Sequence, residues 1–241
     1  MDFLAPKYLG WLLDGWLMTL WSTLIVVIAS TLLGILFAVA RESRNVLLVR
    51  VTDVYISLFR NTPLLVQLFF WYFGLPALLP TDMLAWLNGI HAWTVGGVTL
   101  MRWPSFEFLA AIVGLITYST PYVGEDIRSG LHGVPSHQRL AALALGFTHG
   151  QALRYIVLPQ ALRIATPPLI GQYMNILKNT SLGMAIGLAE LSYRARQAEA
   201  ETWKTFQVYT LTTLLYIVAI LVLELVSRAA QHWQIPSRKA R

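Results

Sequence analysis

The sequence predicts an all-α, polytopic membrane protein with about five transmembrane helices. Apolar residues make up 56% of the 241 residues and charged residues only 12%, about half the share that is usual in soluble domains. Residues 15–40, 61–81 and 205–223 contain no Asp, Glu, Lys or Arg. Such stretches are long enough to cross a bilayer as helices. They leave no room for a separate catalytic domain, so residues 1–241 are expected to form a single transmembrane domain.

The first two spans are expected over residues 16–40 and 51–79. The second contains Arg60, Asn61, Thr62 and Pro63. Polar groups inside a span are unfavourable in lipid and tend to face a bundle interior or a water-filled path. An arginine that extends its side chain to the membrane surface is the alternative for Arg60. Pro63 is expected to kink or break the helix.

The third and fourth spans, residues 106–128 and 164–188, also contain polar side chains. Lys178 lies deep inside the fourth, which suggests a functional site; an ammonium that caps the carbonyls of a broken helix is the alternative. Glu125 and Asp126 are neighbours near the end of the third span. Neighbouring residues on a helix point in different directions, so a catalytic pair of carboxylates is not expected.

Residues 136–163, between these spans, read as a hairpin of two short helices. Ser136 is expected to cap the first helix, and Leu140, Leu143, Ala144 and Phe147 follow the spacing of one apolar helical face. Residues 148–151 have the spacing of a capping box for the second helix, and a proline at position 159 is expected to close it. The hairpin suggests a docking element for another protein, and an ordinary loop is the alternative.

Charge counting orients the predicted helices, the fifth of which covers residues 205–226. One set of loops contains eleven basic residues and the other contains five. Lys and Arg accumulate on the cytoplasmic side, so the N-terminus is expected outside, and the hairpin and the C-terminus in the cytoplasm. The same bias accounts for the net charge of +6, so nucleic acid is not an expected partner. The absence of cysteine excludes disulfides and thiolate metal sites, and no metal site is expected.

The hairpin resembles the EAA loop of ATP-binding-cassette importer permeases. That motif runs Glu-Ala-Ala, three residues, Gly, nine residues and Ile-x-Leu-Pro. Here Ala141 and Ala142 lead through three residues to Gly146, and nine residues later the chain reads Ile-Val-Leu-Pro up to Pro159. Only Leu140 departs, because it occupies the place of the glutamate.

Other segments indicate which branch of these permeases the chain resembles. Residues 59–67, 124–130 and 177–182 are similar to the polar amino acid branch of these permeases, and the likeness extends over about residues 10–230. Within the branch, residues 70–80 look most like the glutamate/aspartate importers.

The resemblance implies a type I ABC importer permease with a cytoplasmic coupling loop over residues 133–163. The expected partners are a second, different permease, two cytoplasmic ATPase subunits, a periplasmic binding protein that delivers the amino acid, and membrane lipid. This chain has no phosphate-binding loop, so ATP and Mg belong to the ATPase subunits and no cofactor is expected here. The location implied is a bacterial inner membrane, and the chain itself is not an enzyme.

The resemblance also implies two groups of site residues. Residues expected to couple to the ATPase are Ser136, Gln138, Arg139, Leu140, Ala141, Ala142, Gly146, Phe147, Arg154 and Pro159. Residues expected to line the substrate path are Arg60, Asn61, Thr62, Tyr118, Ser119, Lys178, Asn179, Thr180 and Ser181.

The expected function is therefore import of glutamate or aspartate, with basic or neutral amino acids as the nearer alternative. A membrane-embedded hydrolase would need a nucleophile and a base on facing spans, and no such pair stands out. A channel would not need the hairpin.

Overall fold

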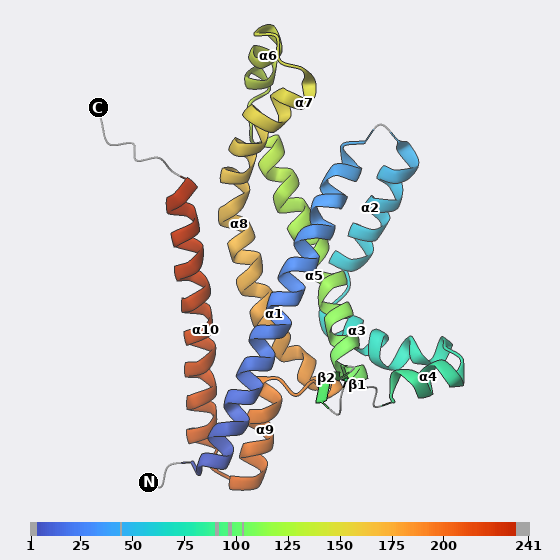
Figure 1. Ribbon diagram of the computed structural model, residues 1–241, viewed down its shortest axis with the longest axis vertical. Coiled ribbons are helices and arrows are strands. Elements are labelled where there is room, and N and C mark those ends of the chain that lie inside the picture. Colours follow the sequence, from blue (N-terminus) through green and yellow to red (C-terminus); the bar gives the residue numbers. More distant parts are fainter. Residues whose placement is uncertain (1–3, 44, 90–91, 96–97, 103, 235–241) are drawn as a thin grey trace.

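The computed structural model describes residues 4–43, 45–89, 92–95, 98–102 and 104–234, which are almost entirely helical (Figure 1). Within these described residues, three helices are long and apolar enough to cross a membrane: α1 (Pro6–Arg41), α5 (Phe106–His132) and the part of α10 (Thr205–Gln234) up to Arg228. The predicted helical membrane fold is thus confirmed, while the count of five spans stays a prediction.

The second expected span is two helices. α2 (Val46–Arg60) ends before Pro63, and α3 (Leu64–Phe69) begins after it. A proline has no backbone N–H and disfavours helix in the residue before it, so the break falls where the sequence predicts it. The chain continues through the π-helix η1 (Phe70–Gly74), the short 3-10 helix η2 (Pro76–Leu78) and α4 (Thr81–Leu87).

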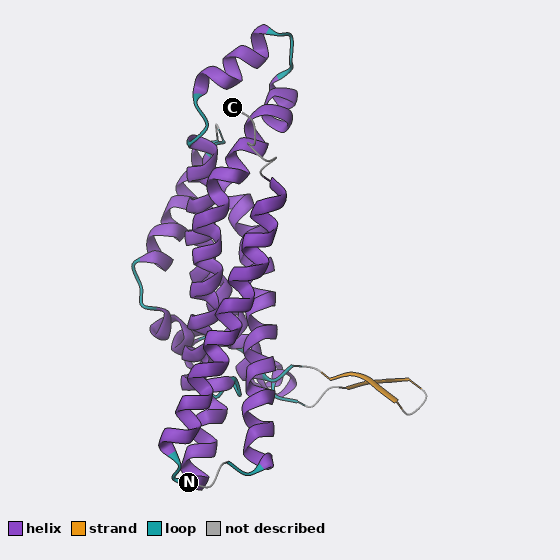
Figure 2. Cartoon of the chain, turned by 90° about the vertical axis from the view of Figure 1, so that its left-hand side faces the viewer, coloured by secondary structure: helices purple, strands orange, loops and turns teal. Residues whose placement is uncertain are grey.

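A small β-hairpin follows in the connection to α5. Strand β1 (Ala92–Val95) pairs antiparallel with β2 (Val98–Arg102) and projects sideways from the helices (Figure 2). The sequence suggested only a long connection here, so this hairpin is an addition to an otherwise helical fold.

The fourth expected span is α8 (Leu158–Asn179) followed by the 3-10 helix η4 (Thr180–Ile186). Before it come α6 (Ser136–Ala144), α7 (His149–Ala152) and the π-helix η3 (Leu153–Val157). α7 passes through η3 directly into α8, so the prediction that Pro159 closes the second helix of the hairpin is wrong. Pro159 occupies the first turn of α8, and the wider π turn before it accommodates the missing donor.

Small residues let the helices approach closely. A Cβ on Gly34 of α1 would lie 3.0 Å from the backbone nitrogen of Gly124 in α5, and one on Gly130 would lie 2.6 Å from the carbonyl oxygen of Ala161 in α8. Such contacts replace the hydrophobic drive that is absent in lipid. Beside them, a core of buried side chains joins α1, α3, α5, α8 and η4: Val26, Leu68, Leu115, Ile176 and Ile186.

The hairpin and α9 (Leu191–Thr202) lie at opposite ends of the molecule (Figure 1). The start of α1 lies beside α9, and α10 runs from the α9 end to the hairpin end. At the α9 end, the buried carboxylate of Glu190 caps α9 and accepts hydrogen bonds from Ser192 N, Tyr193 N and Tyr216 Oη at 2.8–2.9 Å. α1 and α10 therefore begin at one end, where α9 holds them, and end at the other. Which end faces the cytoplasm stays a prediction.

Candidate functional site

One side chain, that of Gln67, stabilises the break between α2 and α3 through hydrogen bonds. The Nε2 amide of buried Gln67 donates to the carbonyl oxygens of Phe59, at 2.9 Å, and Thr62, at 3.1 Å, and to Thr62 Oγ1, at 2.7 Å. These carbonyls have lost their helical partners at the break, and a buried carbonyl without a donor is unfavourable. Gln67 lay in a family-like motif but not among the predicted path residues. The signal in the sequence that could have identified Gln67 is an amide side chain four residues after a proline in the middle of a predicted span.

A polar pocket of about 450 Å³ lies beside this break. It is lined by residues of α1, α2, the break itself and α5: Arg41, Asp53, Ile56, Ser57, Arg60, Asn61 and Tyr122. The Arg60 guanidinium lies 5.4 Å from the centre of the Tyr122 ring, close enough for a cation–π contact. Among the described residues, Arg60 forms no ion pair, whereas Arg41 forms two. The pocket thus presents a cation to a ligand carboxylate and offers hydroxyl and amide groups next to it.

The structure places part of the predicted substrate path at this pocket. Arg60 and Asn61 line it, and the Tyr118 ring contacts the pocket residue Tyr122 with ring centres 5.2 Å apart. Ser119, beside Tyr118, is buried, and its hydroxyl has no hydrogen-bond partner in the described structure. Thr62 is instead used by Gln67 to build the break.

The rest of the predicted path lies at the junction of α8 and η4. Thr180 Oγ1 donates to the carbonyl oxygen of Leu177 and Ser181 Oγ to that of Lys178, both at 2.7 Å. These hydroxyls bind carbonyls at the end of α8. The sequence suggested the same role, as the alternative to a functional site, for the ammonium group of Lys178. Lys178 is exposed and Asn179 is half-buried at the same junction. Among the described residues, none of the hydrogen bonds or ion pairs joins this group to the pocket.

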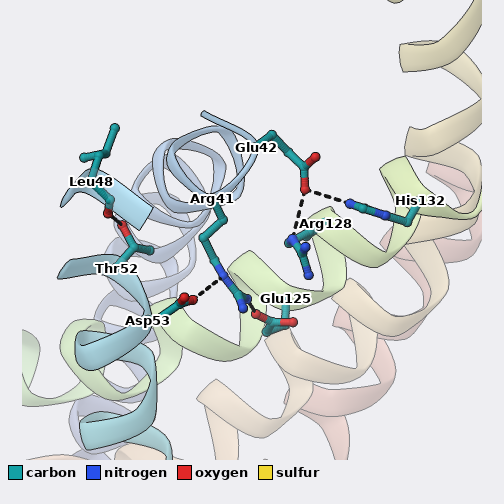
Figure 3. Close-up of polar contacts among 8 residues, drawn as sticks. All are labelled: Arg41, Glu42, Leu48, Thr52, Asp53, Glu125, Arg128 and His132. Carbon is teal, nitrogen blue, oxygen red and sulfur yellow. Dashed lines mark hydrogen bonds and ion pairs between the residues drawn. The ribbon is translucent and has the colours of Figure 1, made fainter. Parts of the chain in front are cut away.

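Two sets of ion pairs fasten the hairpin end of α1, and Figure 3 shows them. Arg41 binds Asp53 of α2 through Nε at 2.8 Å and Glu125 of α5 through a terminal nitrogen. On the next residue, Glu42 Oε1 accepts from Arg128 Nε at 3.0 Å and contacts His132 Nε2 at 2.7 Å. We call these six residues the clasp.

The clasp joins α1, α2 and α5 just before the hairpin begins, since α5 ends at His132 and α6 starts at Ser136. The hydrogen bond from His132, followed by the charges of His132 and Arg128, lowers the pKa of Glu42 below its ordinary value, although partial burial opposes this. The sequence reading missed the clasp. Its signal was the spacing of residues 125, 128 and 132, which places three charges on one face of a helix.

The turn of the hairpin has a defined backbone geometry. Gly146 has φ +87°, its N–H binds the carbonyl oxygen of Leu143 at 3.0 Å, and Phe147 N–H binds that of Ala142 at 3.1 Å. This is a Schellman motif, which ends a helix with a residue in the left-handed region and favours glycine there. The capping box of Thr148 and Gln151 is confirmed. The prediction that Ser136 caps α6 is wrong: Ser136 is the first helical residue, and Pro135 precedes it.

The predicted coupling residues form two groups, one buried or half-buried and the other exposed. Ala142 is buried against the second half of the hairpin, and Gln138 and Phe147 are half-buried. The apolar face predicted from helical spacing is only partly covered, because Leu140 is 60% exposed. The remaining coupling residues lie exposed along the hairpin and at the start of α8: Ser136, Arg139, Ala141, Gly146, Arg154 and Pro159.

The sequence is similar to a family of transport proteins and to individual members of it. Residues 30–239 match the model of a family described as "Binding-protein-dependent transport system inner membrane component". The glutamate/aspartate import permease protein GltJ of Escherichia coli strain K12 is 33% identical over 226 residues, which cover 92% of this chain and 87% of that protein. The arginine transport system permease protein ArtQ of Bacillus subtilis strain 168 is 30% identical, with 96% of each chain covered.

Solved structures give the same fold. The crystal structure of an amino acid ABC transporter with histidines contains a chain that is 30% identical, with a TM-score of 0.79 over 96% of this chain and 98% of that one. An inward-facing structure of the MetNI methionine ABC transporter matches with a TM-score of 0.71 over 97% of this chain and 100% of that one. At 18% identity it supports the fold alone.

Proposed function

This chain belongs to the family of binding-protein-dependent transport system inner membrane components and is an ABC importer permease for amino acids, and we propose that its substrate is glutamate or aspartate. Relatives of this kind are transport subunits and not enzymes themselves, so this chain forms the membrane path. The pocket with Arg60 is the observation that carries the proposal of an amino acid ligand, because a guanidinium suits a carboxylate, and the similarity to GltJ favours an acidic amino acid.

The chemistry of the pocket favours a carboxylate ligand. A guanidinium offers parallel N–H donors that match a carboxylate, and the Tyr122 ring beneath it keeps the cation inside the pocket. Asn61 and Ser57 add neutral hydrogen-bonding groups, and the charge of Asp53 is balanced by its ion pair with Arg41. Every amino acid carries the α-carboxylate, so the pocket alone also fits the competing proposal of a basic or neutral substrate. Relatives named for arginine and for glutamine keep that alternative open.

The proposed mechanism is alternating access. A periplasmic binding protein delivers the amino acid, and two partner ATPase subunits, which hold ATP and Mg, move the hairpin. The continuous helical path from α7 through η3 into α8 supports this step, because it links the hairpin to the junction at Lys178 without a flexible joint. A second permease completes the path. In this scheme the hairpin faces the cytoplasm of a bacterium, in agreement with the distribution of basic residues.

Uptake of labelled glutamate into cells or vesicles that contain the assembled transporter tests the substrate. Unlabelled aspartate is expected to compete strongly, and arginine, glutamine and histidine weakly. Stronger competition by arginine or glutamine would replace the acidic substrate with that amino acid. Arg60→Gln is expected to reduce uptake, whereas Arg50→Gln, an exposed arginine on the same helix outside the pocket, is the matched control. Equal uptake by the two variants would remove Arg60 from the path.

A further inference from the structure

Two charges of opposite sign beside the pocket belong to no ion pair. Arg41, which also lines the pocket, binds both Asp53 and Glu125. By contrast, neither Arg60 of α2 nor Asp126 of α5 takes part in any ion pair of the described structure. An unpaired charge inside a membrane-spanning bundle is unfavourable, and such groups usually face a partner or a polar cavity where they act.

Asp126 lies next to the pocket. It follows the pocket residue Tyr122 by four residues, so it is one turn further along the same face of α5. Its carboxylate accepts a hydrogen bond from the side chain of Gln172 in α8 and interacts electrostatically with the Arg60 guanidinium. The two unpaired charges are therefore near enough to influence each other, yet they are not in contact.

The Asp126 carboxylate has room for a further donor. Its Oδ2 atom has no hydrogen-bond partner among the described residues, although protein covers it. The residue as a whole is half-buried, so it is not sealed off from solvent. A covered carboxylate oxygen without a donor is destabilising, and an ammonium group, which carries three N–H donors and no acceptor, satisfies it well.

We propose that Arg60 and Asp126 together bind the head group of the amino acid, Arg60 its α-carboxylate and Asp126 its α-ammonium. Both charges of an amino acid are attached to one carbon, so its head group can join a cation and an anion that do not reach each other. This inference rests on the proposed function, because it concerns the ligand of the same pocket. It adds that the pair recognises α-amino acids as a class, while other groups select among their side chains.

The test is binding of labelled glutamate to the purified transporter assembly in nanodiscs, without the periplasmic binding protein, so that only the membrane part selects the ligand. The competitors are unlabelled glutamate, glutarate, which lacks the α-ammonium, and 4-aminobutyrate, which lacks the α-carboxylate. Glutamate is expected to compete about tenfold better, or more, than either analogue, because each analogue loses hydrogen bonds between charged groups. Labelled arginine and glutamine are measured in the same way.

Two variants should change selectivity in opposite ways. Asp126→Asn is expected to weaken glutamate binding by about tenfold or more but to leave glutarate binding unchanged, so the preference over glutarate disappears. Arg60→Gln is expected to remove the preference over 4-aminobutyrate instead. Asp82→Asn changes an exposed carboxylate of α4, outside the pocket, and should keep both preferences. A general loss of structure would weaken the binding of all three ligands equally.

The main competing explanation is a direct ion pair between Arg60 and Asp126 in another state of the transporter. The double variant Arg60→Gln/Asp126→Asn would then recover the binding that each single variant loses, and this result would overturn the proposal. Glutarate that competes as well as glutamate for the unmodified assembly would also overturn it, as would equal weakening of both ligands by Asp126→Asn. Binding of arginine or glutamine in place of glutamate, weakened by Asp126→Asn, would support the head-group site while the acidic substrate fails.

Discussion

Arg41 and Glu125 form an ion pair between the last turn of α1 and the C-terminal part of α5, about two turns before its end, and the same guanidinium also binds Asp53 of α2. The side chains of Arg41 and Glu125 are only 21% and 29% exposed, so water screens this pair less than a surface pair. One cation therefore connects three helices at the end where the hairpin begins.

The first prediction follows from this connection. Arg41→Gln leaves Asp53 and Glu125 without their cation and is expected to destabilise the protein by about 1–3 kcal/mol in unfolding experiments in detergent. Lys7→Gln removes an exposed ion pair with Glu201 and is expected to destabilise the protein clearly less, because water screens exposed pairs. The double variant of Arg41 and Glu125 should lose less than the sum of the two single variants. Equal losses for Arg41→Gln and Lys7→Gln would show that the clasp contributes nothing beyond a surface pair.

The second prediction concerns the pH dependence of the clasp. The pKa of Glu42 is lowered mainly by the hydrogen bond from His132. A carboxyl whose pKa is lowered by folding adds stability above its unfolded value, here 4.5, and loses that contribution as the pH falls through the folded pKa. The contribution of the Glu42 carboxylate to the difference in thermal stability between the unmodified protein and Glu42→Gln is therefore expected to be complete above pH 4.5 and to be lost as the pH falls from 4.5 through the lower folded pKa.

A second variant checks the cause. His132→Ala removes the largest contribution to the low pKa of Glu42, so the loss of stability on acidification is expected to be smaller and to be complete at a higher pH, nearer 4.5. A stability difference that persists unchanged into strong acid would show that Glu42 does not titrate as the geometry requires. So would a midpoint that His132→Ala leaves in place.

Sequence patterns predict local backbone features better than they predict contacts between residues that are far apart in the chain. The helix break at Pro63 and the capping box at Thr148 were predicted correctly, because each acts through the backbone of its immediate neighbours. Pro159 was misread for the same reason: a local rule ends a helix near proline, but the π-helix before it lets the helical path continue into α8. Ser136 was misread because Pro135 takes the cap position.

The clasp and the pocket required the folded chain. The spacing of residues 125, 128 and 132 indicates a polar face on α5, but Arg41 and Glu125 are 84 residues apart in sequence and Glu42 and His132 are 90 apart, so local spacing could not identify the partners of that face. The polar path residues were predicted as one set, yet the structure divides them between the pocket at Arg60 and the end of α8. Composition identifies polar groups inside spans, but only the packing of α1, α2 and α5 decides which of them meet.

The third prediction tests the break between α2 and α3. Gln67→Leu keeps the side-chain size but removes the donor for the carbonyls of Phe59 and Thr62, and we expect a loss of about 1–3 kcal/mol in unfolding stability and reduced uptake. Asn88→Leu removes an exposed amide that binds its own helix, and a change within about 0.5 kcal/mol is expected. Normal uptake by Gln67→Leu would show that the geometry of the break does not matter for transport.

The last prediction concerns the turn of the hairpin. Gly146→Val places a β-branched residue at φ +87°, which costs at least about 1–2 kcal/mol. A Cβ at this position meets no atom within 4 Å, so the strain comes from the backbone alone. The expected result is a normal amount of protein in the membrane, with strongly reduced uptake and little stimulation of the partner ATPase.

Two variants separate the backbone effect from a general loss of structure. Gly146→Asn should keep most of the activity, because asparagine tolerates the left-handed region. Gly150→Val adds the same side chain four residues later, where a Cβ again meets nothing within 4 Å and φ is not positive, so its uptake should be affected less. If Gly146→Val transports and stimulates the ATPase normally, the Schellman turn is not needed for coupling. The hairpin would then transmit motion through α7, η3 and α8 alone, with α6 serving only as a support.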